Sequence, residues 1–203
     1  MKLYGAPMPA PNPRRVRMFL AEKGIDLAET PLDLRKREHK SDEHRDRNSL
    51  GQVPTLELDD GTMISETVAI CRYLEELHPK PPLFGSTAVG KAHVDMWVRR
   101  VEFMIMTPVG MFWRHAHPYT AALLTQHKEF GESNRETVAG GMRWMDRELE
   151  GKQFVAGDTY SMADICLLST VDFANWIGLE IPEDCANLKA WHERVTARPS
   201  ANA

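Results

Sequence analysis

"KLYGAPMPAPNPRRVRMFLAEKGIDLAETPLDL" (residues 2–34) is the stretch that decides the fold. Its first four residues are largely apolar and end in a glycine with prolines beyond, which predicts a short strand. Apolar side chains then recur at helical spacing as far as Gly24, a residue typical of helix ends. Residues 27–34 predict a second strand. A strand, a helix and a strand over this length indicate a βαβ unit with parallel strands.

The next segments extend this unit to a βαβ-ββα domain over residues 1–80. The charged residues 35–49 suit a short exposed helix or a loop. Two strands are predicted within residues 53–65, around an Asp60-Gly61 turn. A helix follows from Glu66 and ends before Pro79, because proline disfavours a helical residue ahead of it.

A proline-rich linker, "PKPPLFG" (residues 79–85), separates this domain from an all-helical one over residues 87–203. Pro108 predicts a kink in the first long helix of the second domain. Ser161 and Asp164 have the spacing of a capping box, which gives Asp164 a folding role rather than a catalytic one. Further helices are predicted over residues 131–150, 161–177 and 187–197.

Composition excludes several classes of protein. With 42% hydrophobic and 27% charged residues and no long apolar run, the chain has no predicted membrane span. A net charge of -4 gives no reason to expect nucleic-acid binding, and the cluster Arg14, Arg15 and Arg17 is interpreted as a solvated helix face. The three cysteines are widely spaced and expected to be reduced, and no secretory signal is visible, which together favour a cytoplasmic protein.

Three motifs, in this order along the chain, resemble those of the glutathione transferases. They are "GQVPTLELDDG" (residues 51–61), "SETVAICRYLEE" (residues 65–76) and "SMAD" (residues 161–164). The resemblance covers nearly the whole chain. It implies a thioredoxin-like α/β N-terminal domain, an all-α C-terminal domain, glutathione as co-substrate, no metal and a homodimer.

The resemblance implies roles for two pairs of residues in glutathione binding. A cis Pro54 would expose the backbone N–H and C=O of Val53, so that the cysteinyl part of glutathione pairs as if it were another strand. Glu66 and Thr67 sit at a predicted helix N-terminus, which favours the γ-glutamyl carboxylate, and Glu66 can accept from the ligand ammonium. The alternatives are an edge-strand proline for Pro54 and ordinary helix capping for Glu66 and Thr67.

The glycine carboxylate of glutathione needs a cation or amide donors. In relatives these come from the region that holds His39, Lys40 and Gln52 here. Most of the charged side chains of "REHKSDEHR" (residues 37–45) are expected to be solvated.

The residue that activates the glutathione thiol in many relatives is missing from this sequence. An unperturbed cysteine thiol has a pKa of about 8.5, so little of it is ionised at neutral pH. Many relatives place a Ser, Tyr or Cys just after the first strand to donate to the sulfur, and the matching position here is Ala10, which has no donor. Tyr4 lies within the strand and is expected to pack or point elsewhere.

Asn12 is the replacement that the resemblance suggests. "APNP" (residues 10–13) is similar to the turn of the bacterial nu-class transferases and of a fungal nitrogen-regulating prion relative, in which the asparagine contacts the sulfur. An amide N–H stabilises a thiolate by hydrogen bonding. Pro13 departs from the glycine of those proteins. The alternative is that Asn12 caps the helix with Pro13 as its first residue.

The function implied is conjugation of the glutathione thiolate to small hydrophobic electrophiles. The alternatives are a glutathione-dependent peroxide or disulfide reductase and a non-catalytic glutathione-binding scaffold. His115 and His117 lack a third ligand at a diagnostic spacing, so no metal site is expected. Apolar residues that can line the electrophile pocket, or else belong to the core, are Met8, Met104, Met111, Phe112 and Trp113.

Overall fold

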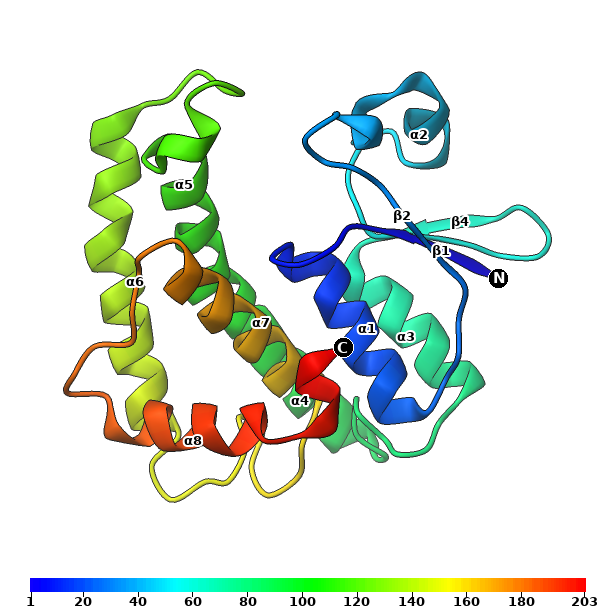
Figure 1. Cartoon of the computed structure of the whole chain (residues 1–203). Coiled ribbons are helices and arrows are strands. Elements are labelled where there is room, and N and C mark those ends of the chain that lie inside the picture. Colours follow the sequence, from blue (N-terminus) through cyan, green and yellow to red (C-terminus); the bar gives the residue numbers. More distant parts are fainter. The chain divides into compact units, whose positions relative to one another are not determined.

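The computed structural model describes all residues, 1–203, and they form two compact units (Figure 1). The first unit contains Met1–Leu83 together with Pro199–Ala203. The second unit contains Phe84–Arg198. The second unit is therefore joined to the first at both of its ends.

A four-stranded sheet forms the centre of the first unit, in the order β2-β1-β3-β4. The expected βαβ-ββα arrangement is confirmed: β1 (Lys2–Gly5) is parallel to β2 (Glu29–Pro31) and antiparallel to β3 (Thr55–Glu57). The hairpin to β4 (Met63–Ser65) is also confirmed, and its turn uses Gly61 at φ 84°. β2 is shorter than the strand predicted over residues 27–34.

Helices cover both faces of this sheet. α1 (Pro11–Lys23) packs against α3 (Thr67–Leu77) on one face, and α2 (Asp42–Arg47) lies on the other, after the 3₁₀ helix η1 (Glu38–Lys40) (Figure 1). Alternate residues of β1 therefore point to different layers. The fully buried core under α1 and α3 includes Leu3, Val16, Phe19, Leu56, Ile70 and Leu74.

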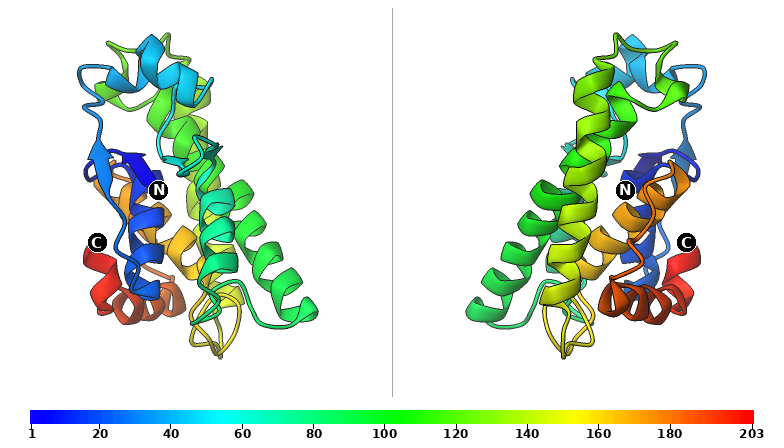
Figure 2. Two further views of the ribbon diagram at one scale, coloured as in Figure 1. Left: turned by 90° about the vertical axis from the view of Figure 1, so that its right-hand side faces the viewer. Right: turned by 90° about the vertical axis from the view of Figure 1, so that its left-hand side faces the viewer.

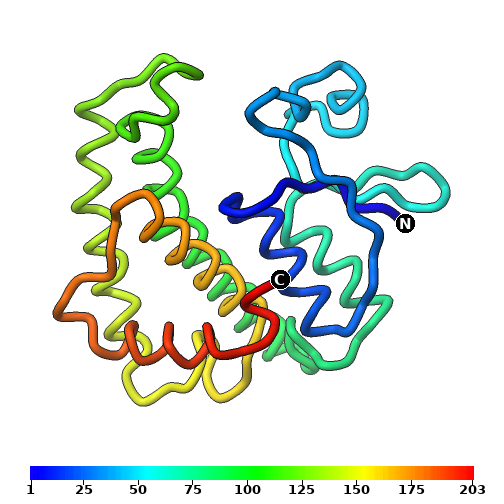
Figure 3. The backbone as a smooth tube through the Cα atoms, in the orientation of Figure 1, coloured from blue at the N-terminus to red at the C-terminus, as the bar shows by residue number.

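Residues 199–203 fold back onto α1, whereas the sequence placed them in the helical domain. They form a 3₁₀ turn, η4 (Pro199–Asn202), beside α1 in the tube view (Figure 3). Arg14 Nη2 donates a hydrogen bond to the carbonyl of Ala201 at 2.8 Å, and the Ser200 hydroxyl donates one to the carboxylate of Glu22. These contacts are polar and join residues that are distant in sequence, so no local sequence pattern predicts them.

The second unit is all helical, as predicted. α7 is its buried centre: nearly every residue from Met162 to Val171 is inaccessible to solvent, which is typical of a helix surrounded by others. It packs against α4 and α8, while α5 and α6 run side by side (Figure 2). The helices are α4 (Ala88–Val101), α5 (Thr107–His115), α6 (Lys128–Glu148), α7 (Met162–Trp176) and α8 (Ala186–Thr196), with a 3₁₀ turn η3 (Pro118–Thr120).

The irregularity expected at Pro108 takes the form of a π-helical turn, η2 (Glu102–Met106), between α4 and α5. Pro108 follows this turn directly in a continuous helical stretch, and the wider turn lies where Pro108 has no N–H to donate to the residues before it. Thr107 Oγ1 donates to the carbonyl of Glu102 at 2.9 Å and so closes the wider turn. The predicted capping box of Ser161 and Asp164 at the start of α7 is present.

No helix combines the length and the apolar character that crossing a bilayer needs. No group of three or more His, Cys, Asp or Glu side chains is arranged to hold a metal ion.

Candidate functional site

The predicted binding residues of the first unit gather at one end of its sheet. β1 and β2 run toward this end, β3 starts from it and β4 returns to it. The segments that follow β1, β2 and β4 and that precede β3 therefore emerge together (Figure 1). Such strand ends are common ligand sites in α/β sheets. The residues on these segments are Asn12, His39, Lys40, Gln52, Val53, Pro54, Glu66 and Thr67.

Val53 and Pro54 form the entry to β3, and the peptide bond between them is cis, as expected. Pro54 is buried and Val53 is half-buried. Because Thr55 pairs with Ser65, Pro54 lies next to Glu66 in the register of the hairpin. The backbone N–H and C=O of Val53 form no hydrogen bond within the chain. This segment therefore presents an unpaired peptide edge beside the start of α3.

Glu66 and Thr67 mark the start of α3. Glu66 is the N-cap, but its side chain makes no capping hydrogen bond and is exposed, so ordinary side-chain capping does not explain it. Its φ of 69° is in the left-handed region, which costs a residue other than glycine roughly 1 kcal/mol. Thr67 is buried at the first position of the helix, where backbone N–H groups have no intrahelical partner. The pair thus offers a carboxylate, a hydroxyl and helix N–H groups.

Asn12 does not cap α1. The helix begins at Pro11, its N-cap is Ala10, and no side chain supplies a capping hydrogen bond, so the alternative interpretation of Asn12 is wrong. Asn12 lies in the first turn with its Oδ1 buried and without a hydrogen-bond partner. Its Nδ2 has no partner in the chain and is not buried, so this amide N–H₂ faces solvent. The donor of the side chain is available to a ligand at the helix N-terminus.

The arginine cluster of α1 is not the solvated face that the sequence suggested. Arg14 and Arg15 are buried, with 6% and 0% of their surface exposed. Arg17 Nη1 donates to the carbonyl of Ala6 at 3.0 Å and to Glu29 Oε1 at 3.1 Å. Arg17 thereby ties the loop before Asn12 to β2. Charge at helical spacing did not distinguish these buried residues from surface ones.

His39, Lys40 and Gln52 come from two segments that pack together. Gly51, at φ 56°, comes so close to η1 that a Cβ there would lie 2.8 Å from the carbonyl oxygen of His39. Lys40 Nζ donates to the carbonyl of Leu50 at 3.0 Å. Burial, followed by the charges of Lys40, His44 and Arg37, lowers the pKa of His39. The lowered pKa disfavours the charged form of His39, which leaves Lys40 as the better cation of this group.

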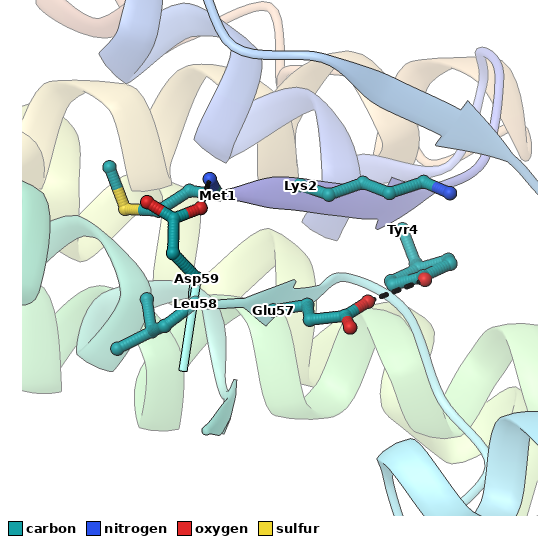
Figure 4. Close-up of a pocket in the computed structure, with 6 residues that line it drawn as sticks. All are labelled: Met1, Lys2, Tyr4, Glu57, Leu58 and Asp59. Carbon is teal, nitrogen blue, oxygen red and sulfur yellow. Dashed lines mark hydrogen bonds and ion pairs between the residues drawn. The ribbon is translucent and has the colours of Figure 1, made fainter. Parts of the chain in front are cut away.

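Tyr4 is committed to a different part of the sheet, as expected. Its hydroxyl donates to Glu57 Oε2 at 2.6 Å, in a shallow pocket that Lys2 and Asp59 also line (Figure 4). The guanidinium of Arg47 lies 4.4 Å from the centre of its ring. The hydrogen bond to Glu57 and burial raise the pKa of the Tyr4 hydroxyl. Tyr4 therefore supports α2 on the sheet.

The residues proposed from sequence to line an electrophile pocket differ in exposure. Met8, in the loop after β1 of the first unit, is 53% exposed, and Met104, in η2 of the second unit, is 51% exposed. Met111 is half-buried, whereas Phe112 is buried beneath the guanidinium of Arg135.

Trp113 lies at the centre of an aromatic cluster that the sequence did not reveal. Its ring is 5.4 Å from Tyr119, 5.4 Å from Phe173 and 5.6 Å from Trp176, centre to centre. The cluster joins the end of α5 to the end of α7, and Trp176 and Tyr119 remain substantially exposed. The second unit therefore presents an aromatic surface beside α5.

Comparisons with known proteins agree with this architecture. The family model described as "Glutathione S-transferase, N-terminal domain" matches residues 10–77, and the one described as "Glutathione S-transferase, C-terminal domain" matches residues 103–199. Glutathione S-transferase 2 of Saccharomyces cerevisiae is 39% identical over 204 residues, which cover 98% of this chain and 87% of the relative.

Solved structures give the same result. The crystal structure of Gtt2 from Saccharomyces cerevisiae aligns with a TM-score of 0.93 at 38% identity, covering 100% of this chain and 99% of that one. A glutathione S-transferase domain-containing protein from Marinobacter aquaeolei aligns with a TM-score of 0.92 at 35% identity, covering 98% and 99%.

Proposed function

The chain belongs to the glutathione S-transferase family and is a glutathione S-transferase, and from this premise we propose that glutathione binds at the sheet end described above. The unpaired peptide edge of Val53 pairs with the cysteinyl main chain of glutathione. The γ-glutamyl carboxylate accepts hydrogen bonds from the backbone N–H groups at the start of α3 and from the Thr67 hydroxyl. The γ-glutamyl ammonium donates to the carboxylate of Glu66. Nothing in this arrangement requires a metal.

The glycine carboxylate of glutathione binds on the side of η1. Lys40 supplies the positive charge, because the lowered pKa of His39 disfavours the charged form of that ring. Gln52 adds an amide donor from the neighbouring loop. On this proposal Lys40→Ala weakens binding more than His39→Ala does.

The observation that carries the catalytic proposal is the orientation of Asn12. Its Oδ1 is turned inward and its Nδ2 outward, at the N-terminus of α1. Here the amide N–H₂ donates to the thiolate sulfur of glutathione, and the partial positive charge of the helix start adds to its stabilisation. Lowering the thiol pKa by one unit requires 1.4 kcal/mol, about the value of one hydrogen bond to a charged group. The likeness of the "APNP" turn to the nu-class turn supports the same role.

Titration of bound glutathione tests this role. Thiolate absorbance, followed against pH in the wild type, is expected to give a pKa at least about one unit below that of free glutathione. Asn12→Ala is expected to lose most of this depression while still binding glutathione, because its other contacts remain. Asn12→Asp places a carboxylate near the sulfur and is expected to raise the pKa above that of the alanine variant. If the thiol pKa of glutathione bound to the wild type equals that of free glutathione, the role of Asn12 is contradicted.

We further propose that small hydrophobic electrophiles contact Met104, Met111 and Trp113 on η2 and α5. The aromatic surface around Trp113 suits planar, apolar substrates. Turnover of aryl halides against turnover of hydroperoxides and mixed disulfides separates conjugation from reduction. A homodimer and a cytoplasmic location are proposed from the family resemblance, and light scattering after gel filtration tests the dimer.

A further inference from the structure

A buried histidine lies behind the proposed glutathione site. His44, on α2, is 1% exposed, and its ring packs edge-on against Tyr4 of β1 with centres 6.3 Å apart. Its backbone N–H donates to the hydroxyl oxygen of Ser41, the N-cap of α2. The ring is therefore held in one orientation by the sheet beneath it and by the helix that carries it.

The ring of His44 points its Nε2 at the backbone carbonyl of Gln52, 2.8 Å away. A carbonyl oxygen only accepts, so Nε2 carries the proton. Asn48 Nδ2 donates to the same oxygen at 3.0 Å, and Thr55 Oγ1 approaches it at 3.4 Å. Side chains from both flanking segments thus converge on one backbone oxygen of the loop.

That oxygen belongs to the peptide unit that contains the N–H of Val53. The six atoms of a peptide unit are coplanar, and in a trans unit the C=O and the N–H point in opposite directions. The Gln52–Val53 bond is not among the cis bonds of the chain. Holding the Gln52 oxygen toward α2 therefore turns the Val53 N–H away from α2, and this N–H has no partner in the chain.

We propose that His44 is a positioning residue for glutathione binding: with Asn48, it fixes the Gln52–Val53 peptide plane so that the Val53 N–H faces the ligand backbone. This inference rests on the proposed function, because it assigns a cause to the orientation of a donor used there. His44 itself does not touch the ligand. Its contribution lies in affinity for glutathione, not in the ionisation of the thiol, which Asn12 governs.

Two amide substitutions of different reach test this role. His44→Gln places its Nε2 close to the position of the imidazole Nε2, whereas the side chain of His44→Asn is one bond too short to reach the Gln52 oxygen. We expect His44→Asn to raise the glutathione Kd and KM about tenfold. We expect His44→Gln to stay within about threefold of the wild type. His78→Gln, at an exposed histidine elsewhere in the first unit, is the matched control.

The pattern of constants distinguishes positioning from general damage. For His44→Asn at saturating glutathione, kcat, the KM for the electrophile and the pKa of the bound thiol are expected to remain at wild-type values. Equal glutathione Kd values for the wild type and His44→Asn, or equal losses in both amide variants, would overturn the inference. If His44→Asn does not fold, His44→Phe, which keeps a ring but has no donor, is measured against His44→Gln with the same criteria.

Calorimetric titration of the wild type with glutathione tests the proposed binding function separately from the role of His44. A wild type that does not bind glutathione overturns the proposed function and the role of His44 together. A wild type that binds glutathione, with Asn12→Ala changing only the thiol pKa and His44→Asn changing nothing, overturns the role of His44 alone.

Discussion

Asp164 is a carboxylate in the core of the second unit, surrounded by hydrogen-bond donors. Its Oδ1 accepts from the Val155 N–H and from Trp191 Nε1, both at 2.9 Å. Its Oδ2 accepts from the backbone N–H and the hydroxyl of Ser161. The capping spacing predicted the Ser161 contacts, but Trp191 lies 27 residues away and joins only through the packing of α8 on α7. Asp164 therefore connects three segments.

Replacing Asp164 should destabilise the second unit. Asp164→Ala leaves donors of Val155, Ser161 and Trp191 buried without an acceptor, and we expect a loss of at least about 3 kcal/mol in the free energy of unfolding. Burial raises the pKa of Asp164 to about 6, from an ordinary value of 3.8. The folded protein therefore binds this proton more tightly than the unfolded chain does, and the contribution of Asp164 to stability falls as pH rises from about 4 to about 6.

Denaturant titrations of the wild type and Asp164→Ala at several pH values measure this difference. The gap between the two free energies of unfolding should be larger at pH 4 than at pH 7 and constant above about pH 7. A gap that widens as pH rises would show that the hydrogen bonds to the carboxylate outweigh its burial.

At the scale of elements, two glycines set how closely α6 approaches the segment before it. A Cβ at Gly131 would lie 2.5 Å from the backbone carbon of His115, and one at Gly141 would lie 2.7 Å from the carbonyl oxygen of Met104. The second contact falls in the π-helical turn η2. Backbone atoms cannot move aside as a flexible side chain can. Close packing of α6 on this irregular turn and on the end of α5 therefore requires residues without a side chain at positions 131 and 141.

The neighbouring glycines of α6 provide a matched test. Gly141→Ala should lower the free energy of unfolding by about 1–3 kcal/mol, because the added methyl overpacks the contact with η2. Gly140→Ala meets nothing within 4 Å and should raise it by up to about 1 kcal/mol through helix propensity alone. Thermal and urea denaturation of both variants measure the difference. Equal effects of the two substitutions would mean that α6 does not approach η2 this closely.

At the scale of the whole molecule, the sequence predicts the features that depend on nearby residues and misses those that depend on contacts between distant residues. The βαβ-ββα order, the cis Val53-Pro54 bond and the helical second unit follow from turn residues, periodicity and family motifs near each element. The burial of Arg14 and Arg15 and the return of residues 199–203 to α1 do not, because their partners are far away in sequence. The anchoring of Gln52 by His44 also depends on how α2 folds onto the sheet.

The return of residues 199–203 gives the first unit a support that comes from the far end of the chain. Deleting these residues removes the Ala201 carbonyl that accepts from Arg14 Nη2 and the Ser200 hydroxyl that donates to Glu22; Arg14 and Glu22 both lie on α1. Arg14 is 6% exposed, so losing one of its acceptors should cost about 1–3 kcal/mol. The loss should be local, because the contacts that the deletion removes are made by α1. Hydrogen exchange should therefore accelerate by about tenfold or more in α1 and remain unchanged in α6.

Asn202→Ala, at an exposed position of the same turn, is the control and should leave both rates at wild-type values. Faster exchange of equal size in α1 and α6, or none in either, would show that the turn does not support α1 in this way.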